Sequence, residues 1–146
     1  MFAMRMKLNQ QIIKKESIQP IYINGKNKGM RFDVQLAYYR GHYLSDIELL
    51  EVHIDSKKVS DEAVTFQLNG KELPLYKLKY AVTEFWSQVD LATIQVLCPE
   101  GIIGSHDIEL KLMLRIPYMQ IGPGHDFMPL DSGDKVTIKL EGEEDE

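Results

Sequence analysis

Histidines and a cysteine are the side chains through which this chain could do chemistry, because no apolar segment isolates a pair of its many carboxylates. None of its four histidines lies two or four residues from another, the spacings that set two metal ligands on one face of a strand or helix. Two histidines precede an aspartate, as His106-Asp107 and His125-Asp126, and could bind a metal only with ligands that the fold brings in. We expect surface or turn histidines, with His53 on the outer face of a strand, and we predict no catalytic and no metal-binding residue.

The only cysteine, Cys98, stands before a proline at the expected end of a strand. A nucleophilic cysteine needs a neighbouring base or a positive field to lower its pKa, and no local motif supplies either. We therefore expect a buried structural thiol. A single cysteine forms no internal disulfide, so nothing indicates an oxidising compartment. The sequence also contains no phosphate-binding loop, dinucleotide fingerprint or serine-nucleophile motif.

Two short segments are rich in the side chains that anchor protein interfaces, tyrosine and arginine. The first is residues 38–43, Tyr-Tyr-Arg-Gly-His-Tyr, and the second is residues 115–119, Arg-Ile-Pro-Tyr-Met. Such side chains can also simply cover the edge of a core or face solvent. The interface that we predict consists of Tyr38, Tyr39, Arg40, Gly41, Tyr43, Tyr118 and Met119. Gly41 is expected to let the backbone turn tightly beside Arg40.

The elements that must position these segments are strands. Residues 107–116 alternate perfectly between apolar and mostly polar side chains, which is typical of a strand with one face on a core. The same period of two recurs in residues 30–37, 50–54 and 136–140. Evidence for helices is thin, because residues 76–86 begin like a helix and end like a strand, and residues 60–63 could form one helical turn.

Glycine-containing turns divide these strands at short intervals. Asn24-Gly25 and Asn69-Gly70 are typical of the type I′ turns that join antiparallel strands, and residues 55–58 and 99–105 also indicate turns. Strands at about 8–12-residue spacing with such turns favour a sandwich or barrel. We predict an all-β fold, a two-sheet antiparallel β-sandwich with about eight or nine strands.

The length of 146 residues suits a single domain, with 44% hydrophobic and 27% charged residues. We expect a lead-in at 1–16, one sandwich domain at 17–140 with an irregular loop at 117–134, and an acidic tail at 141–146. A net charge of −5 argues against nucleic acid as a partner, and no apolar run approaches the roughly 20 residues of a membrane helix. Without a signal-peptide pattern, the expected location is cytoplasmic.

An ordered set of segments carries a family resemblance over roughly residues 18–121. The first segments are Tyr38-Tyr39-Arg40-Gly41, Leu44-Ser45, Ile47, Val52-His53-Ile54-Asp55 and Val64-Thr65-Phe66. The segments that follow are Asn69-Gly70, a lone Trp86, Leu91 to Val96, Pro99-Glu100-Gly101-Ile102, Gly104 to Leu112 and Leu114 to Met119. In this order they resemble the small (beta) subunit of the bacterial C-glycoside deglycosidases. The chain departs from the family at Ser87 to Asp90, where a glycine-containing turn is frequent.

The resemblance implies a β-sandwich that pairs with a larger, catalytic TIM-barrel alpha subunit. That subunit is expected to hold a divalent metal, manganese, and the catalytic histidine. The implied substrate is a flavonoid-type C-glycoside whose sugar has been oxidised to a 3-keto form. Because a ketone at C3 acidifies the proton at C2, a base can start an elimination that breaks the C–C glycosidic bond, the reaction of a carbon–carbon lyase. This chain would then be the non-catalytic subunit and bind no cofactor itself.

Two hypotheses from other classes remain open on the sequence. One is a stand-alone carbohydrate-binding β-sandwich module, in which Tyr38, Tyr39, Tyr43 and Trp86 would provide stacking faces. The other is a self-sufficient enzyme that uses His106 or His125. A neighbouring gene for a sugar-isomerase-like TIM barrel would favour the subunit hypothesis.

Overall fold

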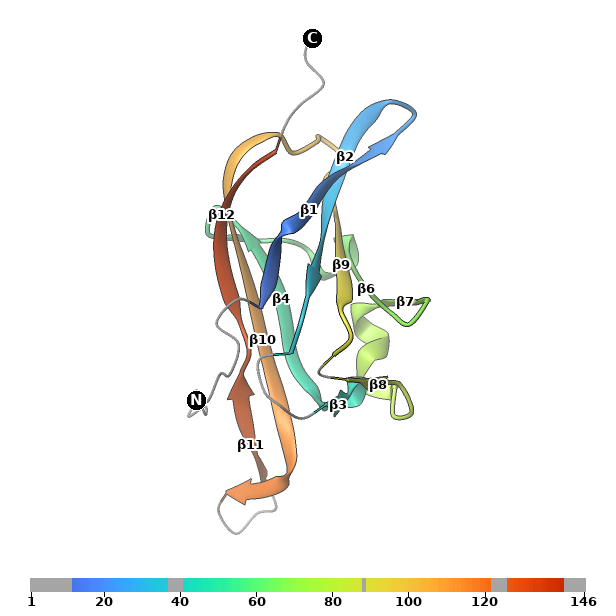
Figure 1. The fold of residues 1–146 in the computed structure, drawn as a ribbon, viewed down its shortest axis with the longest axis vertical. Helices are drawn as coiled ribbons and strands as arrows, with labels where there is room; N and C mark the ends of the chain where they lie inside the picture. Colours follow the sequence, from blue (N-terminus) through green and yellow to red (C-terminus); the bar gives the residue numbers. More distant parts are fainter. Residues whose placement is uncertain (1–11, 37–40, 88, 122–125, 141–146) are drawn as a thin grey trace.

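The computed structural model describes residues 12–36, 41–87, 89–121 and 126–140, and for residues 116–121 and 126–130 the main chain alone (Figure 1). Two five-stranded antiparallel sheets face each other across one hydrophobic core, and a short two-stranded ribbon lies at one end. This arrangement confirms the predicted all-β fold, although the described residues form twelve strands where about eight or nine are predicted. Among the described residues, no helix combines the length and the apolar character that crossing a membrane requires.

The first sheet has the strand order β1-β2-β9-β6-β7, and its neighbours run antiparallel. Its strands are β1 (Ile13–Ile23), β2 (Lys26–Val34), β9 (Ala92–Leu97), β6 (Val64–Leu68) and β7 (Lys71–Pro74). The core-facing side chains alternate along each central strand, as Met30, Phe32 and Val34 do along β2.

The second sheet is built around one long strand, β10 (Gly104–Ile121). The order is β11-β10-β4-β5, and β12 also pairs with β10. The strands beside β10 are β4 (Ile47–Ile54), β5 (Lys57–Lys58), β11 (Asp126–Asp131) and β12 (Asp134–Leu140). β4 pairs with one edge of β10, while β11 and β12 follow one another along the opposite edge.

The alternation that predicts the strand at 107–116 is confirmed over the side chains that are described. Ile108, Leu110, Leu112 and Leu114 are each at most 1% exposed. They pack in the same core as the apolar side chains of β2, β6 and β9. Because side chains alternate along a strand, the polar residues between them face outward.

Three hairpins turn through two consecutive residues with positive φ, as type I′ turns require. The pairs are Asn24-Gly25 at 53° and 79°, Asp55-Ser56 at 52° and 70°, and Asn69-Gly70 at 52° and 82°. Each turn predicted from an Asn-Gly pair is confirmed.

The N-terminal part of the sandwich begins earlier than the sequence predicts. β1 starts at Ile13, inside the expected lead-in of residues 1–16, and both Ile12 and Ile13 are buried. Their N–H groups donate to the Asp134 carboxylate at 2.8 and 2.9 Å, so this segment is tied to the beginning of β12. The link depends on Asp134, 121 residues further on, and local periodicity does not reveal it.

The stretch at 117–134 is not the irregular loop that its prolines and glycines predict. β10 continues to Ile121, and β11 pairs with it from Met113↔Asp131 to Ile121↔Asp126. Proline is tolerated in β11 because this strand lies at the edge of its sheet, where one row of N–H groups needs no partner. β12 follows after Ser132 and Gly133, where a Cβ on Gly133 would lie 2.5 Å from the Leu110 carbonyl oxygen.

The ambiguous region at 76–86 forms both kinds of structure. A 3-10 helix, η3 (Leu75–Tyr80), is followed by the short strand β8 (Phe85–Trp86), which pairs with β3 (His42–Tyr43). Two further 3-10 turns are η1 (Leu44–Asp46) and η2 (Asp61–Ala63). The expected helical turn at 60–63 is confirmed, with the Ser60 hydroxyl accepting from the Glu62 N–H at its start.

Trp86 should be a major contributor to stability. It is completely buried, its indole Nε1 donates to the Asp90 carbonyl at 3.0 Å, and its ring meets Phe66 edge to face at 5.4 Å. We expect Trp86→Ala to lower the free energy of unfolding by about 3–5 kcal/mol. Urea denaturation measures this loss, and Tyr80→Ala is the control because Tyr80 is 70% exposed. Equal stability of the two variants would contradict a core role for Trp86.

Candidate protein-interaction surface

The structure describes part of the interface that the sequence predicts. Tyr38, Tyr39 and Arg40 lie outside the described residues, and Tyr118 and Met119 are described only as main chain within β10. The predicted roles of these five residues stay predictions. Gly41 and Tyr43 are described and lie at the start of the β3–β8 ribbon.

Gly41 is required for close packing rather than for a turn. Its φ is not positive, whereas a Cβ at this position would lie 2.5 Å from the Phe85 ring and 2.7 Å from the Trp86 carbonyl oxygen. The Phe85 ring also meets the Tyr43 ring edge to face, with centroids 5.0 Å apart. Gly41 therefore lets an exposed aromatic pair pack directly against the backbone of its own ribbon.

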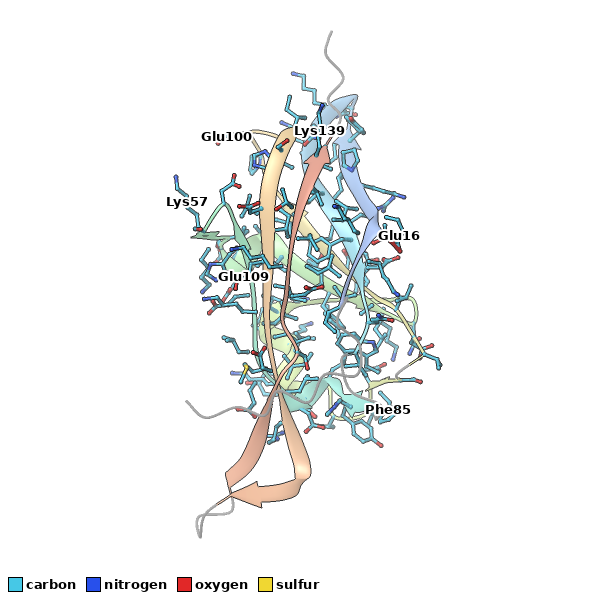
Figure 2. All side chains as sticks on the ribbon, turned by 60° about the vertical axis from the view of Figure 1, so that its left-hand side comes forward. Glu16, Lys57, Phe85, Glu100, Glu109 and Lys139 are labelled. Atoms are coloured by element: carbon cyan, nitrogen blue, oxygen red, sulfur yellow. The ribbon has the colours of Figure 1, made fainter. Side chains whose placement is uncertain are left out.

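Exposed apolar side chains concentrate at this end of the sandwich. Tyr43 and Phe85 are 46% and 45% exposed, and between 63% and 80% of Tyr76, Tyr80, Val82 and Val89 is exposed. We call the surface formed by Tyr43, Tyr76, Tyr80, Val82 and Phe85 the η3–β8 surface. Figure 2 labels Phe85, a residue of β8, at this end. Apolar side chains that gather on one part of a surface mark contact sites for other molecules.

Most of the η3–β8 surface is absent from the interface predicted from sequence. Only Tyr43 belongs to both sets. Which side chains of a segment face outward is predicted from the period of its apolar residues. The sequence of residues 76–86 has neither the period of a helix nor that of a strand throughout, so its outward-facing side chains could not be predicted. Once η3 and β8 are known, Tyr76, Tyr80 and Phe85 are seen to face solvent.

A network of charges holds η1 against β10 beside this surface. The Arg115 guanidinium donates to the Ser45 carbonyl and to the Asp46 carboxylate, each at 3.2 Å, and pairs with Glu48 at 3.1 Å. Asp46 is buried, so its charge needs this partner. The network joins the two sequence segments from which the interface is predicted, because η1 follows residues 38–43 and Arg115 begins residues 115–119.

His42 lies in the interior near this network. It is 3% exposed, and burial is the main influence that lowers the pKa of its imidazole, with the nearby Asp46 carboxylate acting in the opposite direction. The imidazole of His42 is therefore an uncharged, buried side chain of the β3–β8 ribbon.

The remaining histidines and the cysteine have structural surroundings. Both ring nitrogens of His106 face acceptors, the Asp55 carboxylate and the Ile103 carbonyl, each at 2.7 Å. His53 bonds to Glu51 on the same outer face of β4 at 3.0 Å. Cys98 is only partly buried, so the expected full burial is not observed, but burial still raises the pKa of its thiol and so disfavours the thiolate. His125 lies outside the described residues.

A metal centre does not emerge from the described residues, among which no three histidines, cysteines or carboxylates are grouped closely enough to hold an ion. Both ring nitrogens of His106 are engaged within the protein, with the Asp55 carboxylate and the Ile103 carbonyl. The η3–β8 surface itself offers exposed apolar and aromatic side chains for binding another molecule.

Comparison with known proteins gives consistent matches. Residues 8–118 match the family model described as "C-glycoside deglycosidase beta subunit". A protein of that name from Eubacterium cellulosolvens is 30% identical over 97 residues, which is 66% of each chain. A "3'-dehydrocarminate deglycosidase beta subunit" from a Microbacterium species is 28% identical over 96 residues, 64% of this chain and 70% of the relative. A C-glycoside deglycosidase beta subunit from Microbacterium trichothecenolyticum is 29% identical over 107 residues, 73% of this chain and 81% of the relative.

The His106–Asp55 pair predicts a specific pH dependence of stability. A neutral imidazole can donate from one nitrogen only, so His106 satisfies its two acceptors as an imidazolium, and the Asp55 carboxylate raises the pKa of His106 above 6.5. Its contribution is complete below pH 6.5 and is lost as the pH rises through the raised pKa of the folded protein. The pKa of Asp55 is lowered, mainly by the Asp107 N–H, so its contribution is lost as the pH falls below 3.8.

In the wild-type chain, the free energy of unfolding should decrease as the pH rises from 5.5 to 8.5. We expect this decrease to be smaller in His106→Asn. Chemical denaturation at each pH measures it, and the proton resonances of His106 report its pKa directly. Asp55→Asn should return that pKa toward its usual value. An unchanged pKa in Asp55→Asn would contradict the assignment.

Proposed function

The chain belongs to the C-glycoside deglycosidase beta-subunit family, and we propose that it is the non-catalytic subunit of a complex that cleaves C-glycosides. A beta subunit is one component of a multi-subunit enzyme. The observation that carries the proposal is the exposed apolar η3–β8 surface, which suits permanent contact with another chain.

The proposed partner is a TIM-barrel alpha subunit that holds a divalent metal, manganese, and the catalytic base. The described residues of this chain do not group into a metal site. A divalent metal would stabilise negative charge on an enolate oxygen.

The proposed substrate is a C-glycoside with a ketone at C3 of its sugar. One relative's name supports this choice, since it specifies 3'-dehydrocarminate as the compound that is deglycosylated. A base removes the C2 proton, and the electrons of that C–H bond come to form the C1–C2 double bond. The electrons of the C1–aryl bond leave with the aglycone carbon, which takes up a proton, so the reaction is a carbon–carbon lyase elimination without hydrolysis.

Tyr43 and Phe85 would be the central contacts with the alpha subunit. The two rings contact edge to face, and the Phe85 ring packs directly against Gly41. These side chains therefore lose little conformational freedom when a partner covers them. We propose that Tyr38, Tyr39, Arg40, Tyr118 and Met119 extend this contact, with Arg40 able to bridge a carboxylate in a fixed geometry.

The alternative of a stand-alone carbohydrate-binding module is weakened by one specific residue. Trp86, the strongest candidate for stacking on a sugar, is fully buried. Tyr43 is exposed, but Phe85 contacts it edge to face.

Activity should require both subunits. We expect the purified chain to leave a 3-keto C-glucoside intact, with or without Mn²⁺, and co-expression with its TIM-barrel partner to give one species on size-exclusion chromatography that releases the aglycone. Liquid chromatography of the aglycone measures turnover. Release of aglycone by the single chain would overturn the proposal, and so would a partner that is fully active alone.

Removing the Phe85 ring should weaken assembly without unfolding the chain. We expect Phe85→Ala to reduce the binding free energy for the alpha subunit by about 2 kcal/mol, as central aromatic contacts do. Isothermal titration calorimetry measures the affinity. Leu97→Ala is the matched control, since Leu97 is similarly exposed, at 41%, but lies on β9 away from this surface. Equal affinities for the two variants would move the interface elsewhere.

A further inference from the structure

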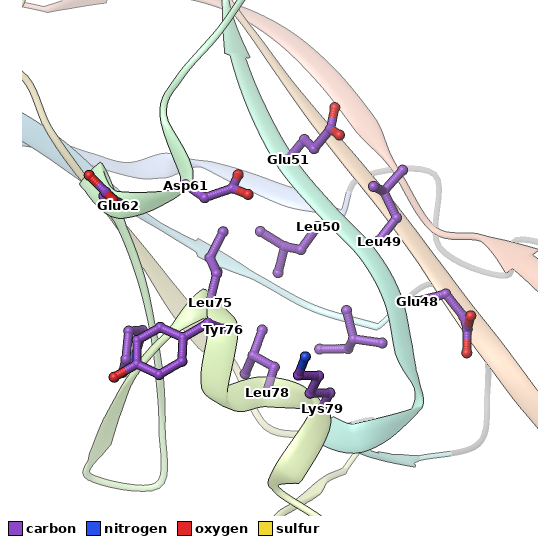
Figure 3. Close-up of a pocket in the computed structure, with 12 residues that line it drawn as sticks. Glu48, Leu49, Leu50, Glu51, Asp61, Glu62, Leu75, Tyr76, Leu78 and Lys79 are labelled. Atoms are coloured by element: carbon purple, nitrogen blue, oxygen red, sulfur yellow. The ribbon is translucent and has the colours of Figure 1, made fainter.

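A groove beside β4 provides a second, chemically distinct contact site. It has a volume of about 580 Å³ and lies between β4 on one side and η2 and η3 on the other (Figure 3). Leu50, Leu75 and Leu78 provide apolar lining, and Tyr76 connects the groove to the η3–β8 surface. The groove is therefore continuous with the proposed interface.

One wall of the groove is an open strand edge. β5 covers β4 only at His53 and Ile54, and among the described residues no strand pairs with the outer edge of β4 from Ile47 to Glu51. The Val52 carbonyl points to that outer edge, because it accepts from the Val59 N–H. The main-chain groups of a strand alternate in direction, so the N–H and C=O of Leu50 point the same way.

The hydrogen bonds of the neighbouring strand agree with this direction. Leu50 lies opposite Leu112, and the Leu112 carbonyl points away from β4 to accept from the Ser132 N–H. Leu50 and Leu112 are therefore a non-hydrogen-bonded pair, which leaves the Leu50 main chain available to another strand. Open edges of this kind add extended segments of other chains.

The charges around the groove favour a basic occupant. Glu48, Glu51, Asp61 and Glu62 are among its lining residues, against the single cation Lys79. Lys58 pairs with Glu51 and Asp61 at 3.9 and 3.5 Å, and Arg115 pairs with Glu48, whereas Glu62 forms no ion pair with a described residue. In Figure 3, Glu51 and Asp61 lie at one end of the groove, above the leucines.

We propose that the edge of β4 binds an extended segment of the partner subunit in which apolar side chains alternate with lysine or arginine. The segment pairs with the main chain of Leu50, places apolar side chains on Leu75 and Leu78, and directs basic side chains toward Glu62 and Asp61. The choice of the partner subunit rests on the proposed function, through the continuity at Tyr76. The strand addition itself rests on the geometry of β4.

Short peptides test the strand addition separately from the assembly. We expect acetyl-Val-Lys-Val-Lys-Val-Lys-amide to shift the amide resonance of Leu50 in the ¹⁵N-labelled chain and to slow its hydrogen exchange. The glutamate counterpart should do neither. The lysine peptide with its alternate amides N-methylated keeps its charge but loses main-chain donors, so it should also fail. Equal effects of all three peptides, or no effect of any, would overturn the inference.

A charge-reversal variant tests whether Glu62 in the lining of the groove attracts the basic side chains of the bound segment. We expect Glu62→Lys to weaken binding of the lysine peptide about tenfold, because it replaces an attraction by a repulsion. Glu100→Lys is the control with the same change of charge at an exposed site outside the groove. Equal weakening by both variants would mean that only the net charge of the chain matters.

The assembled complex then separates this inference from the proposed function. In the co-purified complex, the Leu50 amide should be protected from exchange, and Glu62→Lys should weaken assembly while Glu100→Lys does not. A complete and active complex with an unprotected Leu50 would overturn the docked segment and leave the proposed function intact. Failure to form any complex would overturn the proposed function. A dimer of the chain alone that protects Leu50 would assign the groove to a second copy and contradict the inference.

Discussion

Burial of alternate side chains along β10 organises the second sheet and, with it, the end of the molecule that carries the proposed interface. The strand contributes Ile108, Leu110, Leu112 and Leu114 to the core. It pairs with β4 along one edge and with β12 and then β11 along the other. A shift of one residue would turn all four apolar side chains to the outer face, so the register is strongly fixed.

The position of the η3–β8 surface depends on the second sheet through Arg115 of β10. This residue points away from the core on β10 and holds η1 by its bonds to Ser45 and Asp46. η1 directly follows β3, whose partner β8 carries the exposed Phe85 next to the buried Trp86. A buried tryptophan and an exposed phenylalanine on adjacent residues of one short strand fix the ribbon to the core and present its outer face to a partner.

The sequence allows the strands, their antiparallel turns and the all-β fold to be predicted, because alternation and Asn-Gly pairs are local signals. It does not reveal features that depend on distant residues. The Asp134 carboxylate fixes the start of β1, and pairing with β10 makes a strand of residues 126–131 despite Pro129. Most of the η3–β8 surface is missed for the same reason, since Phe85 faces outward only because Trp86 faces the core.

Hydrogen–deuterium exchange of the chain with and without its alpha subunit tests most directly whether this end of the sandwich binds the catalytic partner. On complex formation, we expect slower exchange in peptides covering residues 41–45 and 76–87, and unchanged exchange in the hairpin of β1 and β2 and in β12. Protection confined to that hairpin or to β12, with none around Tyr43 and Phe85, would contradict the account.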